Sequence, residues 1–453
     1  MLPEVAALMT VYAEQWQKLL APHRITGTGT CCYELSDDRN PFLQDYDRIV
    51  FSSSFRRLAK KTQVHPLSRN DHIHNRLTHS LEVSCVGRSL GILAGQAAAG
   101  RGDMPQGFTP VHFGQIVQAA CLAHDIGNPP FGHAGESAIQ DWFKDEQNGG
   151  NYLKELREYE KTDFKTFDGN AQGFRLINRI ENNKDRGGFR LTFPVIAALV
   201  KYPNSSYEAV GSDSKKFNYY AAEKNIFCQV FETLGLSCGG FRRHPLSYLL
   251  EAADDVCYRI IDMEDARELR IISYEDILDV LEPLKAALNI DEEKQKAMDS
   301  DRRRAGFLRA QLISHIVRSL GRTFEDKYAE IMEGRLEGSL LKHAESEVAD
   351  YLERAKRIFT EKILNNNQKI SLEVGAYNLY RRLLDVFIPA CFKVKMNRRL
   401  TYQEERALHL MGVNAPTHDD DLYQSYLRVL DFISGMTDDY ATFISRQFSG
   451  TAG

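Results

Sequence analysis

Apolar residues recur along most of this chain at the spacing of an α-helix, and this periodicity limits the fold more than any other feature. The clearest case is a single apolar stripe formed by Leu77, Leu81, Val83, Val86, Leu90 and Leu93. Further helices are predicted at about 41–60, 110–126, 170–184, 217–235, 244–264, 301–321, 346–364, 370–388 and 419–447. No run shows the clear alternation of a β-strand. The fold is therefore predicted to be mainly α.

Short polar and glycine-rich stretches separate these helices, as expected of turns rather than of long linkers. They lie at 100–103, 148–151, 204–206 and 211–214. The chain shows no internal repeat and no low-complexity tract. We therefore predict a helical N-terminal extension over 1–40, a site-bearing helical core over 41–270, and additional C-terminal helices over 271–453 that pack on this core.

Composition and net charge exclude few classes of function. The 453 residues are 43% hydrophobic and 26% charged, as in a globular protein with a large core, and their formal net charge is −5. This charge argues against a generic nucleic-acid or membrane-surface protein, although a local basic pocket could still bind an anion. Nucleic acid is thus not an expected partner.

The sequence also favours the cytoplasm. Its first residues lack the basic start and apolar run of a secretory signal, and no stretch approaches the roughly 18 apolar residues of a membrane helix. The eight cysteines, among them Cys85, Cys121 and Cys257 in apolar helical patterns, show no CxxC spacing. We expect reduced, mostly buried thiols and no membrane association.

Four ionisable residues interrupt apolar, helix-like segments and are predicted to hold one metal ion. These residues are His79, the neighbouring pair His124 and Asp125, and Asp254. Imidazole and carboxylate ligands suit Mn, Fe, Ni, Co or Zn, and four protein ligands leave coordination positions for water and a phosphate oxygen. A single histidine of this kind would more often be a packed core residue, but three coherent motifs favour the metal site.

Local geometry supports two of these choices. Adjacent helical residues point about 100° apart, so His124 and Asp125 converge most easily near a helix end, which the sequence GNPP at 127–130 supplies. Asp254 is preferred to Asp255 as the ligand because Asp254, Tyr258 and Asp262 share one helix face. The alternative for Asp255 is a solvated or hydrogen-bonded partner.

These motifs resemble the HD superfamily of metal-dependent phosphohydrolases, and within it the bacterial dGTP triphosphohydrolase-like proteins. The resemblance extends over most of the chain through SFRRL at 54–58, KTQV at 61–64, RLTHSLEV at 76–83, PFGHAGE at 130–136, GNAQ at 169–172, KYP at 201–203 and GMTD at 435–438. It implies an HD phosphohydrolase core within 41–270 and hydrolysis of a deoxynucleoside triphosphate (dNTP) to the deoxynucleoside and inorganic triphosphate. Attack would occur at the α-phosphorus, with dGTP among the substrates.

The resemblance also implies roles for particular residues. The metal ligands fall on His79, His124, Asp125 and Asp254, and the catalytic pair on His133 and Glu136. Positions that contact the triphosphate fall on Arg76, Lys201 and Tyr258, a position that binds the sugar 3′-hydroxyl on Asp262, and one near the sugar on Gln63. A divalent metal is implied, with Mn or Mg ahead of Fe, Ni, Co or Zn, together with a homo-oligomer and a second dNTP as an activator.

The proposed proton-transfer pair is consistent with simple chemistry. His133 and Glu136 lie at i and i+3, so the carboxylate can orient the imidazole and raise its basicity. Whether His133 acts as general base or general acid stays open, and the alternative is a surface His–Glu pair of little consequence. Many relatives carry a second histidine where this chain has Asn128, which concentrates proton transfer on His133.

The predicted substrate contacts have structural alternatives. Lys201 could instead be a helix C-terminal residue that complements the helix dipole, and Asp262 an ordinary exposed acid. Gln63 offers a donor and an acceptor, and a close fit there would exclude a ribose 2′-hydroxyl.

Other charged residues are interpreted as structural. Arg56 and Arg57 are read as salt-bridge anchors ahead of interface or regulatory roles, and His65, His72 and His74 as part of a loop rather than a second metal site. Two other functions remain open: an HD phosphohydrolase acting on nucleoside monophosphates or cyclic nucleotides, and a catalytically silent protein that senses nucleotides or binds nucleic acid.

Overall fold

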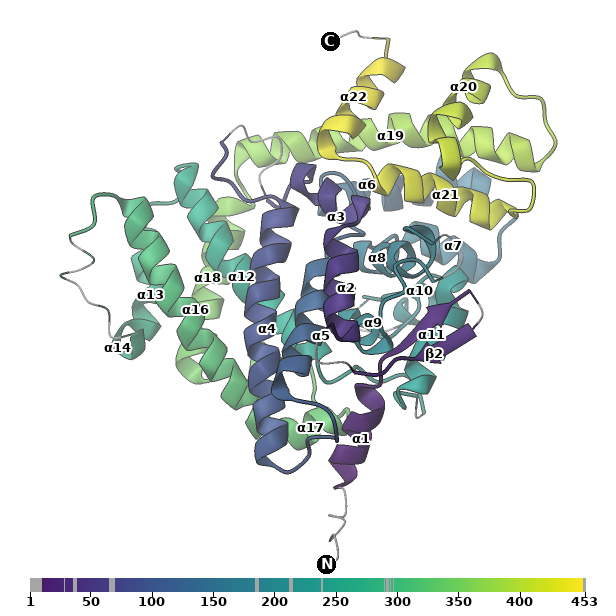
Figure 1. The fold of residues 1–453 in the computed structure, drawn as a ribbon. Coiled ribbons are helices and arrows are strands. Elements are labelled where there is room, and N and C mark those ends of the chain that lie inside the picture. The colour runs from purple at the N-terminus through teal and green to yellow at the C-terminus, as the bar shows by residue number, and fades with distance from the viewer. Residues whose placement is uncertain are drawn as a thin grey trace, which may run out of the picture.

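The computed structural model describes residues 10–450 except for 28, 36–38, 65–69, 184–186, 212–214, 238, 289, 291, 292, 294 and 296. The prediction of a mainly α fold is confirmed, because helices account for most of the described chain (Figure 1). The described residues contain one sheet, an antiparallel pair of the strands β1 (His23–Thr26) and β2 (Gly29–Cys32). The sequence did not reveal this hairpin, because strands of four residues are too short to establish an alternating pattern.

A tight pair of helices lies at the centre of the fold, α4 (Arg76–Gly100) and α5 (Pro110–Ala123). Asn75 caps α4 by accepting hydrogen bonds from the amides of Leu77 and Thr78, and Pro110 occupies the first turn of α5. The two backbones approach so closely that a β-carbon on Gly91 would lie 2.7 Å from the carbonyl oxygen of Phe113. Glycine at this position therefore permits the contact that brings both helices to the site.

The first hydrophobic core surrounds this pair and contains buried residues from the N-terminal region to Ile363. The most extensive packing on α4 and α5 comes from α2 (Pro41–Val50), α9 (Phe193–Leu199), α12 (Ser247–Glu268) and α16 (Asp301–Asp326). Its outer helices include α1 (Val11–Leu19), α11 (Lys224–Thr233), α13 (Tyr274–Leu281), α17 (Tyr328–Met332) and α18 (Ser346–Ile358). This core supports all three segments that carry the predicted metal ligands.

A second hydrophobic core joins the middle of the chain to its C-terminal part. Its helices are α6 (His133–Lys144), α7 (Glu158–Lys165), α19 (Asn367–Lys395), α20 (Tyr402–Met411), α21 (Leu422–Ser434) and α22 (Asp438–Phe448). In Figure 1, α19 to α22 lie along the top of the molecule above α6. The division of the chain at residues 40 and 270 stays a prediction.

Several predicted helices end earlier than the periodicity indicated. The stretch 41–60 contains α2, then α3 (Ser53–Arg57) and a 3₁₀ turn (Leu58–Lys60), because the side chain of Ser52 caps a new helix. The stretch 419–447 is divided into α21 and α22, with Thr437 capping the second helix. The stretches 170–184 and 346–364 contain the π-helical turns Leu176–Ile180 and Phe359–Ile363. Local capping thus interrupts stripes that the apolar pattern alone continues.

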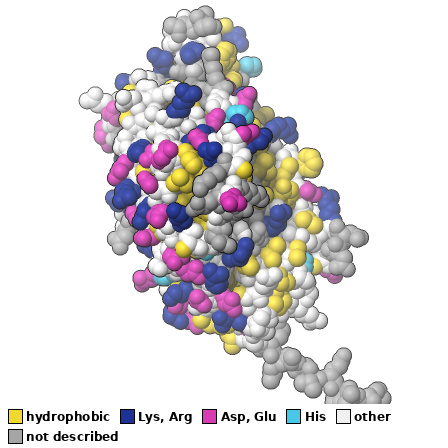
Figure 2. Space-filling view, turned by 90° about the vertical axis from the view of Figure 1, so that its left-hand side faces the viewer, with side chains coloured by type: hydrophobic (Ala, Val, Ile, Leu, Met, Phe, Trp, Pro, Cys, Tyr) yellow, Lys and Arg dark blue, Asp and Glu magenta, His cyan; other side chains and the backbone are white. Residues whose placement is uncertain are grey.

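The surface gives little indication of a charged partner on the face in view. Figure 2 shows Lys and Arg side chains interspersed with Asp and Glu on the face that carries α13, α16 and α18, and no single sign dominates there. Within the described residues, no helix has the length and apolar character needed to span a membrane.

Candidate active site

A cavity of about 410 Å³ lies where the two cores meet. Its size is within the usual range for small-molecule sites. The walls come from α4, from the turn after α5, from the start of α6, from α12 and from the segment 359–373. All of the predicted metal ligands and both members of the predicted proton-transfer pair line this cavity.

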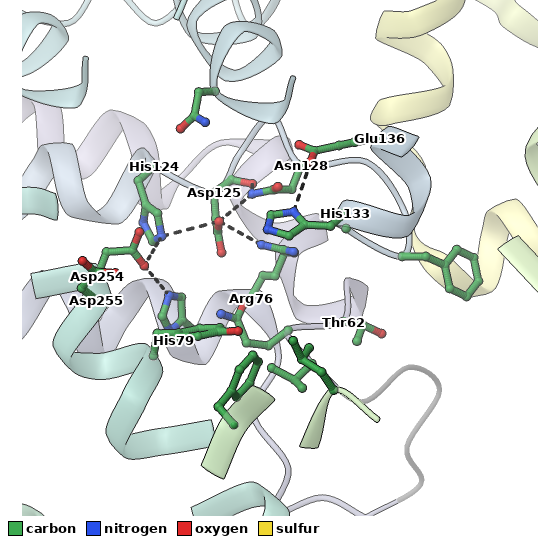
Figure 3. Close-up of a pocket in the computed structure, with 18 of the residues that line it drawn as sticks. Thr62, Arg76, His79, His124, Asp125, Asn128, His133, Glu136, Asp254 and Asp255 are labelled. Carbon is green, nitrogen blue, oxygen red and sulfur yellow. Dashed lines mark hydrogen bonds and ion pairs between the residues drawn. The ribbon is translucent and has the colours of Figure 1, made fainter. Parts of the chain in front are cut away.

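The predicted metal ligands converge from three helices of the first core. His79 lies in the first turn of α4, His124 and Asp125 directly follow α5, and Asp254 lies on α12. Nε2 of His79 is 3.1 Å from Oδ1 of Asp254, and Nε2 of His124 is 3.4 Å from the same oxygen. Figure 3 shows the two imidazoles and both carboxylates directed at one point.

The arrangement of these atoms fits a divalent metal ion. One ligand atom each from His79, His124 and Asp125 can be chosen so that all lie within 4.8 Å of one another. Nδ1 of His124 is 2.6 Å from the carbonyl oxygen of Cys121, which fixes Nδ1 as the donor and leaves the Nε2 lone pair for a ligand. Within the described chain, Nε2 of His124 and Oδ2 of Asp125 are buried without hydrogen-bond partners. A metal ion would satisfy both atoms.

Basic side chains surround the two carboxylates. Nζ of Lys201 lies 2.5 Å from Oδ2 of Asp254, and a guanidinium nitrogen of Arg76 lies 2.9 Å from Oδ1 of Asp125. Burial disfavours the charged form of Asp254, but Lys201 and His124 outweigh it and hold the pKa of Asp254 well below its usual range. Burial likewise opposes ionisation of Asp125, and Arg76 lowers the pKa of Asp125. Both carboxylates are therefore poised to act as charged ligands.

Asp255 points away from this group. Its carboxylate pairs with Arg259 at 3.2 Å, one turn further along α12, and its side chain is 38% exposed. This is the hydrogen-bonded role given as the alternative for Asp255, and the structure brings Asp254 to the histidines.

His133 and Glu136 form an oriented pair at the start of α6. Nδ1 of His133 lies 3.1 Å from Oε2 of Glu136, and the amide of Gly169 donates to Oε1 of Glu136 at 2.7 Å. The carboxylate is nearly buried whereas the imidazole is 87% exposed. The hydrogen bond and charge of Glu136 raise the pKa of His133. The imidazole therefore presents its Nε2 edge to a ligand while Glu136 fixes its tautomer.

Four of the five predicted substrate contacts line the cavity, namely Gln63, Arg76, Lys201 and Tyr258. Lys201 follows the end of α9, and its ammonium contacts Asp254. The ring of Tyr258 packs on Phe359 with a centroid distance of 4.7 Å. These positions place cationic and phenolic donors around the metal ligands.

Asp262 differs from the other four. It is fully buried on α12, so the alternative of an ordinary exposed acid is wrong. Both of its carboxylate oxygens lack a hydrogen-bond partner among the described residues, and burial raises the pKa of Asp262 well above its usual range. It does not line the cavity, and His74 and Arg76 are among the charged groups that act on it. An unsatisfied buried carboxyl retains the capacity to bind a hydroxyl donor.

The cavity contains residues that sequence reasoning missed. Lys216 and Asn170 lie near Glu136, and Nζ of Lys216 is 3.3 Å from Oδ2 of Asp168, the capping residue of α8 (Gly169–Arg175). Lys369 and Glu373, an ion pair on α19, line the same cavity. Asn170 lies in the GNAQ motif and could have been selected from it. An i, i+4 pair such as Lys369 and Glu373 usually marks a solvated helix face, so the sequence did not indicate that these two residues line a site.

The residues read as structural have structural contacts. Arg57 pairs with Glu181 at 3.0 Å, and Arg56 donates to the carbonyl oxygen of Phe51. His74 lies in a loop, as predicted, with Nδ1 2.7 Å from Asp265 and Nε2 3.3 Å from Glu82. His72 also lies in this loop and contacts Arg302, whereas His65 lies outside the described residues.

Known proteins resemble this chain over nearly its whole length. Residues 76–175 match the HD domain family. The chain is 42% identical to the deoxyguanosinetriphosphate triphosphohydrolase-like protein of Pseudomonas aeruginosa strain LESB58, over 96% of this chain and 98% of that protein. It is 35% identical to the protein of the same name from Synechocystis, over 96% and 99%. It is 30% identical to a deoxyguanosinetriphosphate triphosphohydrolase of Yersinia pestis strain Pestoides F, over 88% and 92%.

Proposed function

This chain belongs to the HD-domain family of deoxyguanosinetriphosphate triphosphohydrolase-like proteins, and from that membership we propose a specific reaction. The protein hydrolyses a dNTP, with dGTP among its substrates, to the deoxynucleoside and inorganic triphosphate. The observation that carries the proposal is the shared cavity, in which the four metal-ligand candidates lie beside the oriented pair His133 and Glu136. Metal-ligand candidates, a titratable imidazole and several cations in one cavity are what such a hydrolysis requires.

His79, His124, Asp125 and Asp254 are the residues that would hold the metal ion. A bound divalent ion supplies Lewis-acid polarisation of a phosphate oxygen and a more acidic water. Mn or Mg is proposed first, and Fe, Ni, Co and Zn suit the same ligands. Other contacts of these side chains hold them in position in the absence of the ion. Examples are the hydrogen bond of His124 with the carbonyl oxygen of Cys121 and the ion pair of Asp254 with Lys201.

The cations of the cavity are proposed to bind the triphosphate. Arg76 presents a planar guanidinium on the first turn of α4, and Lys201 presents an ammonium beside Asp254. Tyr258 can donate a hydrogen bond from its phenol. Donors fixed in advance stabilise the charge that develops as the phosphate ester bond breaks.

His133 is proposed to transfer the proton. The Nδ1 contact with Glu136 leaves Nε2 to take a proton from the attacking water or to give one to the departing 5′ oxygen. Asn128 cannot share this work, and in the structure its amide donates to Oδ1 of Asp125 at 2.6 Å. Asn128 is thus a partner of a metal ligand, and proton transfer depends on His133.

The deoxyribose is proposed to lie near Gln63 and Asp262. Gln63 lines the cavity and would exclude a 2′-hydroxyl by close contact. Asp262, one turn beyond Tyr258, has no hydrogen-bond partner for either carboxylate oxygen among the described residues. It is fully buried and does not line the cavity, so it would accept the 3′-hydroxyl once the residues that cover it move. A homo-oligomer, a second dNTP as activator and a cytoplasmic location complete the proposal on the strength of family membership.

The test is a product analysis of the purified, Mn²⁺-loaded protein. Each of the four dNTPs and GTP is supplied separately and in mixtures, and products are separated by chromatography. Deoxynucleoside with intact triphosphate is expected, and activity only in mixtures would identify an activating nucleotide. Monophosphate with pyrophosphate would show cleavage of another bond, and the absence of products under every condition would contradict the proposal.

A further inference from the structure

The turn that presents His133 has an unusual backbone. Phe131 and Gly132 both have positive φ angles, 61° and 55°, and Gly132 is the residue directly before α6. Positive φ is costly for a residue with a bulky side chain such as phenylalanine. A β-carbon on Gly132 would also lie 2.6 Å from a guanidinium nitrogen of Arg76. Such a turn persists only where surrounding contacts hold it.

Three side chains from distant parts of the chain hold this turn by its backbone. The amide of Phe131 donates to Oδ1 of Asp438 at 3.0 Å. The phenol of Tyr380 donates to the carbonyl oxygen of Pro130 at 2.8 Å. Nζ of Lys61 donates at 2.6 Å to the carbonyl oxygen of Asn128 and, also at 2.6 Å, to that of Ser434. Asp438 and Tyr380 belong to the C-terminal helices α22 and α19.

Asp438 also bonds a second segment of the cavity wall. Its Oδ2 accepts a hydrogen bond from the amide of Thr62 at 2.9 Å and a second from the hydroxyl of Thr62. Thr62 and its neighbour Gln63 both line the cavity. The Asp438 carboxylate is buried, with 3% exposure, at the first residue of α22. One carboxylate therefore joins the turn before His133 to the wall that carries Gln63.

The position of α6 explains why these contacts affect His133. The metal-ligand candidates lie on helices of the first core, whereas α6 packs through Ile139, Trp142 and Phe143 into the second core with α19 and α21. Figure 1 shows α6 beneath α19, away from the central part of α4. The distance from His133 to the metal ligands thus depends on how the second core meets the first.

We propose that Asp438, Tyr380 and Lys61 are positioning residues that fix His133 relative to the metal ligands. The C-terminal helices α19 and α22 then contribute to the active site, because they supply two of the three side chains that hydrogen-bond the turn. The effect on turnover rests on the proposed function. The hydrogen bonds that hold the backbone of the turn do not rest on the proposed function, and their effect can be measured without a substrate.

The first test compares Asp438→Asn with Asp439→Asn, an exposed neighbour on the same helix. An amide keeps the shape of Asp438 but can accept from one of its two backbone partners at most, while its NH₂ meets a donor. We expect the peptide covering 128–136 to exchange amide hydrogens about tenfold faster in Asp438→Asn than in the control. The reason is that the amide of Phe131 loses the carboxylate that accepts its hydrogen bond and opposes opening of the turn. Unchanged exchange would overturn the proposal.

The second test separates positioning from general stability. With bound metal and soluble yield matched, Asp438→Asn should lower kcat about tenfold or more at little changed KM, since small misplacement of a catalytic group is costly. A lower melting temperature with normal kcat would show that the contact is merely stabilising. If the wild type hydrolyses no dNTP, the exchange comparison still decides the positioning while the proposed function fails.

Tyr380→Phe provides an independent variant should Asp438→Asn not fold. It removes one hydroxyl from a fully buried ring and leaves the packing of the second core in place. Tyr377→Phe, which removes a partly exposed phenol from the same helix, is the matched control. Faster exchange over 128–136 in Tyr380→Phe alone is expected, and equal exchange in both variants would contradict the assignment.

Discussion

Nε2 of His79 lies 3.1 Å from Oδ1 of Asp254, although 175 positions separate the two residues in the sequence. The contact joins the first turn of α4 to the middle of α12 and defines where a metal ion would sit. Asp254 is held there by Lys201, whereas Asp255 turns to Arg259. The directions of the two side chains therefore favour Asp254 over Asp255 as the candidate ligand.

Asp254→Asn is expected to lose the metal ion, whereas Asp255→Asn retains it. The amide removes the charge that faces both histidines and leaves Lys201 without its partner. Metal affinity should fall by more than about 100-fold in the first variant, beyond the loss typical of an outer-shell contact. Metal content after dialysis, measured by mass spectrometry, checks this. Loss of metal from Asp255→Asn alone would show that the ligand assignment is wrong.

His133→Ala is expected to keep the metal ion and lose turnover. The side chain contacts Glu136 and is not one of the four metal-ligand candidates, so the ligand group stays intact. General acid or base catalysis contributes roughly 10²- to 10⁴-fold, and kcat should fall by that factor. Steady-state kinetics on metal-matched samples measures the change. Turnover near the wild-type value would exclude the proton-transfer role.

Glu136→Gln should move the pH dependence of kcat to lower pH. The hydrogen bond and charge of Glu136 raise the pKa of His133 above 6.5. The part of the wild-type pH–kcat profile that follows titration of His133 therefore lies above pH 6.5. Glutamine keeps the acceptor for the Gly169 amide but removes the charge. Asp141→Asn, an exposed change on the same helix, should leave the profile in place. A profile that does not shift would show that His133 is not the titrating group.

The metal-ligand candidates were predictable because their charges interrupt apolar helical stripes, and such interruptions are conspicuous in a sequence. The second core was not, because its contacts join residues far apart along the chain. The amide of Phe131 and the carboxylate of Asp438, for example, are separated by 307 positions. The periodicity placed Asp262 on the same face of α12 as Asp254 but could not show that it is covered.

Helix boundaries show the same division between local and distant causes. Ser52 and Thr437 cap helices through their own side chains, so the breaks inside 41–60 and 419–447 were in principle readable from nearby sequence. The ion pair of Lys369 and Glu373 lines the cavity only because α19 lies across α6. No local pattern distinguishes such a pair from a solvated one.

Stability is expected to fall in mild acid through His244. This imidazole is fully buried, accepts from the amide of Leu246 and donates to the carbonyl oxygen of Leu19. Burial lowers the pKa of His244 to about 4, below the 6.5 of an unfolded chain. The unfolded state therefore binds more protons as pH falls from 6.5 toward 4, and about 2 kcal/mol of unfolding free energy is lost between pH 7 and pH 5.

His244→Gln provides the test of that assignment. The variant should be less stable at pH 7 but lose less further stability by pH 5, because glutamine does not titrate. His418→Gln, at a fully exposed histidine, should keep the wild-type pH dependence. Denaturant titrations at both pH values measure the slopes. An unchanged slope in His244→Gln would place the acid sensitivity elsewhere.

Arg175→Met is expected to destabilise the junction between α8 and α21. Arg175 is buried and donates to Glu223 at 2.6 Å and to both carboxylate oxygens of Asp431 at 2.8 and 2.9 Å. Removing it takes away the nearest cation of two buried carboxylates, although Glu223 keeps Arg179 at 3.6 Å and Asp431 keeps the Gln172 amide at 2.9 Å. Breaking a buried ion pair in this way typically costs about 3–5 kcal/mol. Arg322→Met breaks an exposed pair with Glu345 and should cost at most about 1 kcal/mol. Equal losses in denaturant titrations would show that the buried network does not stabilise the fold.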